Sequence, residues 1–192
     1  MKSYTIFPDI VFSGTLPVDS DIKQQLLSDT ETLSNTGACI ETTYGWLSNK
    51  DVPVKDSLRK LQLLLGRTFV QHSEKAFGPV TKRRASVVQP HIVSIKPMHT
   101  YDLHINSAYW YQGCAWLQTT DKGNHLFLES PSAKRYACPP AYQQHQTFEQ
   151  AESMKYVFWP AHIQAGFTPN QSMINSIIFN FGITSDAVNR RS

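Results

Sequence analysis

The stretch that decides the fold is residues 87–183, which opens with VVQPHIVSI (Val87–Ile95) and closes with INSIIFNFGI (Ile174–Ile183). Short apolar or alternating runs lie between these two segments, separated by turn residues. The candidate strands are residues 87–95, 101–106, 110–119, 125–129, 156–159, 162–167 and 174–183. Many short strands with turns between them are typical of a closed all-β barrel. We therefore predict a β jelly roll in the C-terminal half.

The N-terminal half predicts two helices. Asp19 or Ser20 can cap the first, which ends at Asn35 and Gly37, and Asp56 or Ser57 can cap the second. Residues 4–12 and 38–47 are expected to be extended. The second helix carries an apolar stripe that is expected to pack on the core: Leu58, Leu61, Leu65 and Phe69, widened by Leu64 and Val70.

Composition is that of an ordinary globular protein, with 192 residues, 41% hydrophobic and 17% charged. We expect one α+β domain, 1–192, in which 1–80 supply strands and two helices and 81–192 form the jelly-roll core. The formal net charge of +3 is too small to indicate a specific nucleic-acid partner. No apolar run approaches a membrane span, so the prediction is a cytoplasmic protein without a membrane partner.

Cysteine usage gives no sign of a disulfide framework or a zinc knuckle. Cys39, Cys114 and Cys138 are an odd number without a C-x-x-C pair, and Cys114 is expected to pack as a small apolar residue. Lys82-Arg83-Arg84 is interpreted as a solvated loop, and residues 139–152 as a long polar loop. The aromatic cluster of Tyr109, Trp110, Tyr111 and Trp116 is expected to divide between core and surface.

The most informative pattern is a set of short motifs in fixed order. They are His104-Ile105-Asn106, Gly113, then Gly123, Leu126, Phe127, Glu129, Ser130 and Pro131, then Phe158-Trp159-Pro160, Asn170 and Phe179-Asn180-Phe181. This order resembles a family of 2-oxoglutarate/Fe(II)-dependent oxygenases of the double-stranded β-helix type, a jelly-roll or cupin-like barrel. Ile6-Phe7-Pro8 and Gly45-Trp46-Leu47-Ser48 extend the resemblance over nearly the whole chain.

The resemblance implies a metal site that this sequence does not complete. Two histidines and one carboxylate bind Fe(II) in such enzymes. His104 falls on the first ligand position, but Asn106 takes the second and Ala165 takes that of the distal histidine. We therefore expect these positions to be vestigial. Asp102 and His162 are the alternative ligands, although strand alternation points His162 away from the face of Ala165.

The anchor for 2-oxoglutarate is also missing. The resemblance places its arginine near Ile174 or Asn175, both uncharged, and the sequence contains no Lys or Arg between Lys155 and Arg190. A dianion without a counter-charge is costly to bury. The sequence therefore predicts no cofactor and leans towards no enzymatic activity, with Fe(II) and 2-oxoglutarate as the alternative.

Two functions follow from the resemblance. The first is a non-catalytic jelly-roll protein, a pseudoenzyme that contacts other protein subunits in an assembly. Compact relatives of the family occur in tailed phages, which makes a virion structural component or a homo-oligomer the concrete form of this expectation. The second is an active Fe(II)/2-oxoglutarate-dependent dioxygenase with atypical ligands.

Other arrangements of polar residues are weaker. His99, Asp102 and His104 form an H-x-x-D-x-H pattern that could ligate a metal, but such residues more often form hydrogen bonds at a barrel mouth. Ser107 or Cys114 could pair with a histidine as a nucleophile, yet neither lies in a nucleophile motif.

Overall fold

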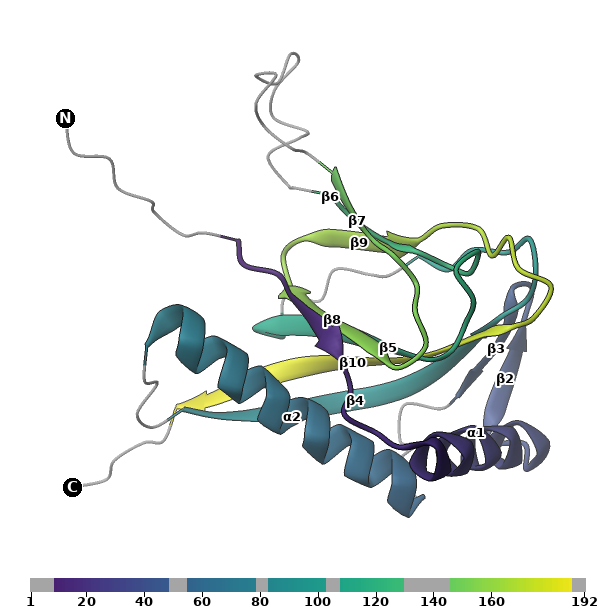
Figure 1. The fold of residues 1–192 in the computed structure, drawn as a ribbon, viewed down its shortest axis with the longest axis horizontal. Helices are drawn as coiled ribbons and strands as arrows, with labels where there is room; N and C mark the ends of the chain where they lie inside the picture. Colours follow the sequence, from purple (N-terminus) through teal and green to yellow (C-terminus); the bar gives the residue numbers. More distant parts are fainter. Residues whose placement is uncertain (1–8, 49–54, 79–82, 103–107, 130–145, 188–192) are drawn as a thin grey trace, which may run out of the picture.

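The computed structural model describes residues 9–48, 55–78, 83–102, 108–129 and 146–187 (Figure 1). Within these ranges the chain forms helices α1 and α2 and strands β1 to β10. Their bounds are β1 Phe12–Thr15, α1 Ser20–Asn35, β2 Cys39–Thr42, β3 Gly45–Ser48, α2 Asp56–Phe77, β4 Arg83–Ile95, β5 Tyr111–Gln118, β6 Leu126–Glu129, β7 Gln146–Glu149, β8 Lys155–Pro160, β9 Gln164–Phe167 and β10 Ser176–Ala187.

The two helices lie where periodicity predicts them, but only one is capped as expected. The Asp19 carboxylate accepts a hydrogen bond from the Ile22 N–H at 2.8 Å, which confirms it as the cap of α1. The prediction for α2 is wrong. Lys55 is its N-cap residue and makes no side-chain cap bond, while the Ser57 hydroxyl donates instead to Asp29 of α1 at 2.5 Å. That hydrogen bond joins the two helices.

Two sheets face one another. The larger has the strand order β1-β8-β5-β10-β4-β3-β2, and the smaller has the order β7-β6-β9. All strand pairs are antiparallel, and an isolated bridge between Asp102 and Gly166 adds a segment beside β9. In Figure 1 the smaller sheet lies over one face of the larger sheet and the helices over the other. This is the α+β double-stranded β-helix expected from the sequence.

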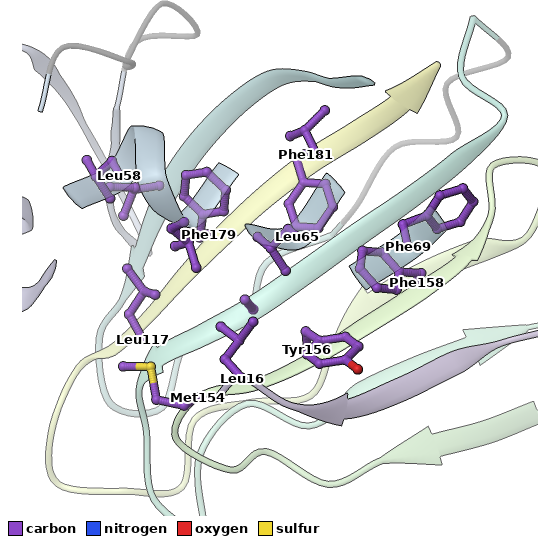
Figure 2. Packing of buried hydrophobic residues seen from close by; sticks show 14 of the residues in the cluster. Leu16, Leu58, Leu65, Phe69, Leu117, Met154, Tyr156, Phe158, Phe179 and Phe181 are labelled. Carbon is purple, nitrogen blue, oxygen red and sulfur yellow. The ribbon is translucent and has the colours of Figure 1, made fainter. Parts of the chain in front are cut away.

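The outer face of the larger sheet is covered by the helices. Leu58, Leu65 and Phe69 of α2 are at most 1% exposed and pack with Phe158, Phe179 and other residues of the sheet (Figure 2). The predicted stripe on α2 is therefore confirmed as a core-facing surface. Leu64 and Val70, at its margin, are half-buried.

The inner face of the larger sheet packs against the smaller sheet, and we call the space between them the barrel interior. Its apolar cluster combines residues of both sheets: Val93, Ile95, Cys114, Trp116, Val157, Trp159 and Ile178 from the larger, with Leu126, Leu128, Ala165 and Phe167 from the smaller. The expected division of the aromatic residues between core and surface is wrong, because both faces of the larger sheet are covered. Tyr111 packs under the helices and Trp116 lies in the barrel interior, while Tyr109 and Trp110 are half-buried.

Three boundaries differ from the sequence-based expectation. β1 pairs with β8 over Phe12–Thr15, so it continues past residue 12, where the extended run is expected to end. Arg83 and Arg84 extend β4 by pairing with β10, so they are not part of a loop. Residues 146–149, expected to be loop, form edge strand β7, whose Phe148 is 61% exposed. The predicted strand at 101–106 falls partly outside the described residues. Within them, the Tyr101 carbonyl accepts from the Phe167 N–H and Asp102 bridges to Gly166.

Gly45 allows β3 to approach β4 closely. A Cβ atom at this position would lie 1.9 Å from the carbonyl oxygen of Ser94, and its φ of +150° disfavours other residues. The glycine of the Gly45-Trp46-Leu47-Ser48 motif therefore has a structural role in joining the β2–β3 hairpin to the barrel. No helix in the described ranges is long and apolar enough to cross a membrane.

Candidate functional site

The barrel interior includes the position that the sequence assigns to the distal histidine. Ala165 lies on β9 opposite Leu128 of β6 and is 4% exposed. Its methyl group belongs to the apolar cluster between the two sheets. The side chain at this position thus points into the barrel, but it offers no donor atom for a metal ion.

His162 and Asp102, the alternative ligands, both lie at the surface. The His162 imidazole is 59% exposed, and its Nε2 lies 2.9 Å from the Asp9 carboxylate. Asp102 is exposed beside Gly166. His99, of the H-x-x-D-x-H pattern, is also exposed and contacts the Pro97 carbonyl through Nδ1 at 2.8 Å. None of these three side chains is buried in the barrel interior.

His104, Asn106 and Ser107 lie outside the described residues. Among those that are described, no group of three His, Cys, Asp or Glu side chains could hold a metal ion. Ala165 and the outward-facing His162 do not supply the second histidine that an iron site needs. The described residues therefore do not fit Fe(II).

The expected cosubstrate position lies at the end of the barrel near Asn170. Ile174 is 43% exposed and Asn175 is exposed, immediately before β10. Lys155 of β8 lies elsewhere, and its ammonium group is paired with the Glu149 carboxylate at 3.0 Å. The expected arginine is thus replaced by neutral residues at the surface, and Lys155, the cation of β8, already has a partner.

Asn170 organises this end of the barrel, which we call the Asn170 end. It is 0% exposed, and its amide nitrogen donates to the carbonyls of Ile95 at 3.1 Å and Ile174 at 2.9 Å. Its amide oxygen accepts from the N–H and hydroxyl of Ser172 at 3.1 and 2.6 Å. All four hydrogen-bonding positions of the side chain are therefore used.

Asn124 and Trp116 complete the Asn170 end. The Asn124 amide nitrogen donates to the carbonyls of His99 and Thr168, and its backbone carbonyl accepts from the Trp116 indole at 3.0 Å. Only the Asn124 side-chain oxygen lacks a partner here among the described residues. These bonds tie three loops together.

Sequence reasoning missed a second polar group further along the same strands. Asn180 of β10 is 2% exposed, and neither its amide nitrogen nor its amide oxygen has a hydrogen-bond partner in the described part of the chain. The indole nitrogen of Trp159 on β8, 1% exposed, is likewise unpaired there. We call this region the Asn180 end. Its sequence signal was the alternation Phe179-Asn180-Phe181, in which both phenylalanines pack under the helices.

Cys114 lies directly opposite Asn180 on β5. Complete burial is the main cause that raises the pKa of its thiol well above the usual value, and the Glu149 carboxylate adds to the effect. A buried protonated thiol is a poor nucleophile. Its structure matches the predicted role as a small apolar residue.

Comparison with known proteins rests on structure alone. No family model and no curated protein matches the sequence. Solved structures do match, including a prolyl-4-hydroxylase from Pseudomonas putida at TM-score 0.62 and 8% identity, covering 90% of this chain and 91% of that one. An oxidoreductase of the 2OG-Fe(II) oxygenase family from Burkholderia pseudomallei matches at TM-score 0.63 and 10% identity, covering 96% and 88%.

A third structure is the non-heme alpha-ketoglutarate-dependent epimerase SnoN from nogalamycin biosynthesis, at TM-score 0.65 and 10% identity, covering 92% of this chain and 78% of that one. Such low identities establish a shared fold and leave the activity open. The chain has the fold of the 2OG-Fe(II) oxygenases, which is the class that its motifs resemble.

Proposed function

We propose that this chain is a non-catalytic protein built on the oxygenase scaffold, and that it acts by contacting other protein subunits. The observation that carries the proposal is Ala165, an alanine whose buried side chain occupies the interior position expected for the distal histidine. The neutral, surface-exposed Ile174 and Asn175 support it from the cosubstrate side.

An exposed apolar patch at the Asn170 end supports the subunit contact. We define it as Met98, Met173 and Ile174, which are 77%, 92% and 43% exposed. The patch is held by Asn170, whose carbonyl accepts from the Met98 N–H at 2.7 Å and whose side chain donates to the Ile174 carbonyl. Apolar side chains held outward on a hydrogen-bonded framework are typical of protein contact sites. A subunit of a virion or of a homo-oligomer is the concrete form.

The alternative is an active Fe(II)/2-oxoglutarate-dependent dioxygenase with atypical ligands, which the matching enzyme structures favour. Anaerobic titration of the full chain with Fe(II), followed by addition of 2-oxoglutarate, separates the two. The proposal expects no stoichiometric iron binding and no turnover. Tight binding of one Fe(II) per chain that is lost in His104→Ala, together with turnover, would establish the enzyme instead.

Light scattering of the purified chain tests the subunit contact. Self-association is expected to be lost in Met173→Asp, because a buried unpaired charge would be costly in an apolar interface. Leu63→Asp is the matched control, since Leu63 is 56% exposed on α2 and lies outside the patch. A monomeric wild-type chain, or equal loss in both variants, would contradict self-assembly through this surface.

A further inference from the structure

The Asn180 end has unused hydrogen-bonding capacity inside a folded barrel. Asn180 offers a donor and an acceptor and Trp159 offers a donor, and none of these atoms has a partner in the ranges that the structure describes. Both side chains are at most 2% exposed. Buried polar groups are nearly always satisfied by protein or by a bound molecule, because leaving them unpaired costs free energy.

Strand register places both groups on the inner face of the larger sheet. Asn180 lies opposite Cys114 of β5, which lies opposite Val157 of β8. Two residues further along, Trp159 lies opposite Gln112. Side chains directly opposite one another in a sheet share a face, and Cys114, Val157 and Trp159 all belong to the interior cluster. Asn180 of β10 and Trp159 of β8 therefore both face inward, with Gln112 of β5 between their strands.

Tyr109 forms an aromatic wall beside them. Gly182, the next inward position of β10 after Asn180, has no side chain, and a Cβ atom there would lie 2.5 Å from the Tyr109 ring. The ring thus covers Gly182, and its hydroxyl donates to the Gln89 side chain. The described part of the site combines one amide with both polar atoms unpaired, one indole N–H and a second aromatic ring.

Trp116 shows that the fold can satisfy an indole in this interior. It lies on the same face of β5 as Gln112, is 0% exposed, and donates to the Asn124 carbonyl at 3.0 Å. Trp159 has the same chemistry and burial without such an acceptor. The two side chains with unpaired N–H groups, Asn180 and Trp159, both belong to the Asn180 end, whereas the described residues of the Asn170 end leave only the Asn124 side-chain oxygen unpaired.

The one cation of β8 begins that strand, at the other end from Trp159, and it is already paired. Lys155 and Glu149 pair at 3.0 Å, and the chain has no Lys or Arg from residue 156 to residue 189. An anionic ligand would therefore find no unpaired cation on β8, β9 or β10. A primary amide matches Asn180 best, because its N–H and C=O can exchange two hydrogen bonds with the Asn180 amide, while the second lone pair of its oxygen can accept from the indole N–H.

We infer that the Asn180 end of the barrel interior binds a small neutral molecule bearing an amide group, held by the Asn180 amide and the Trp159 indole N–H. This binding is independent of the subunit contact at the Asn170 end.

The test is a titration of the ¹⁵N-labelled full chain followed by NMR of side-chain N–H signals. Acetamide and propionamide are the primary-amide probes, glycerol is the neutral hydroxyl probe and 2-oxoglutarate is the dianionic probe. Both amides are expected to shift the Trp159 indole and Asn180 amide signals saturably. The Trp116 indole signal, already bonded, is expected to stay in place. Glycerol and 2-oxoglutarate are expected to bind at least about ten-fold more weakly than the amides.

Variants decide whether the shift reports this site. Asn180→Leu is expected to weaken amide binding by about ten-fold, because both hydrogen bonds are removed. Asn175→Ala, an exposed asparagine just before the same strand, is expected to leave binding unchanged. Trp159→Phe removes the indole donor but keeps an aromatic ring, and amide binding can still be followed by the Asn180 signal. This variant tests the site if Asn180→Leu does not fold.

Three outcomes of the titrations would overturn the inference: Trp159 and Asn180 signals that do not move with the amides, an equal response to glycerol or 2-oxoglutarate, and amide binding that persists in folded Asn180→Leu. A fourth is magnetisation transfer to the Trp159 N–H from a bound water that the amides do not displace. The last result would mean that an ordered water alone satisfies these groups.

Discussion

Asn170 and Asn180 are two buried asparagines at opposite ends of the barrel interior, and they differ completely in their bonding. Asn170 makes four hydrogen bonds through its side chain, whereas neither polar atom of the Asn180 side chain has a partner within the described residues. The same residue type thus has two roles. At the Asn170 end the side-chain amide hydrogen-bonds to backbone carbonyls and to a backbone N–H, while at the Asn180 end it is available for the ligand that we infer.

The indoles repeat this contrast. Trp116 donates to a carbonyl at the Asn170 end, and Trp159 has no acceptor in the described part of the chain at the Asn180 end. Stability is therefore concentrated where loops must be held together, and recognition where polar atoms remain unpaired. Such a division is expected of scaffolds whose functional sites retain groups that stability alone would not select.

The largest effect is expected at the Asn170 end. Asn170→Ala would remove the side-chain donor to the Ile95 carbonyl and the acceptor of the Ser172 N–H, while the Ile174 carbonyl would keep the Ser172 hydroxyl as a donor. Each buried unpaired group costs about 1–3 kcal/mol, partly relieved by water. We expect a loss of about 3 kcal/mol in the free energy of unfolding, measured by urea denaturation. Asn175→Ala, at an exposed site, should change it by less than about 0.5 kcal/mol. Equal effects would show that the Asn170 bonds are not structural.

The next effect compares the two indoles. Trp116→Phe and Trp159→Phe remove the same atoms from equally buried positions, but only the first strands the Asn124 carbonyl. We expect Trp116→Phe to be more destabilising by about 1 kcal/mol. Urea denaturation of both variants gives the difference directly. A larger loss in Trp159→Phe would show that its indole is satisfied and would remove the contrast.

Asn180→Leu is expected to act in the opposite direction from Asn170→Ala. Leucine has a similar volume and takes away two unpaired polar atoms, so the free energy of unfolding should rise by about 1 kcal/mol. Thermal unfolding of the ligand-free chain checks the sign, with Asn170→Leu as the matched variant that should lose stability. Destabilisation in both would mean that Asn180 also supports the fold.

The sequence predicts the elements whose residues repeat with a clear period. Leu58, Leu65 and Phe69 recur at helical spacing, and the structure buries them against the sheet as expected. Strand β7 was missed because Gln146–Glu149 alternates weakly and its Phe148 points to solvent at the sheet edge. Edge strands bury little, so their composition resembles that of loops.

Ala165 and the Asn180 end also differ in how far the sequence predicts them. The inward position of Ala165 follows from counting along a motif, and burial places its side chain in the barrel interior. The Asn180 end could not be predicted, because it depends on the joint register of β5, β8 and β10 and on which neighbours fail to reach each polar atom. A one-dimensional pattern shows that Asn180 faces away from Phe179 and Phe181, but not what it meets there.

The smallest effect is expected at His162, outside the barrel interior. Its imidazole and the Asp9 carboxylate form an exposed pair at 2.9 Å, and such pairs contribute about 0–1 kcal/mol. His162→Gln should therefore change the free energy of unfolding by less than about 0.5 kcal/mol, and it should leave the Fe(II) titration and amide binding as in the wild type. Urea denaturation and the two titrations measure these quantities on one preparation. Loss of a stoichiometric Fe(II) signal in this variant would place His162 among metal ligands and move the functional centre away from Asn180.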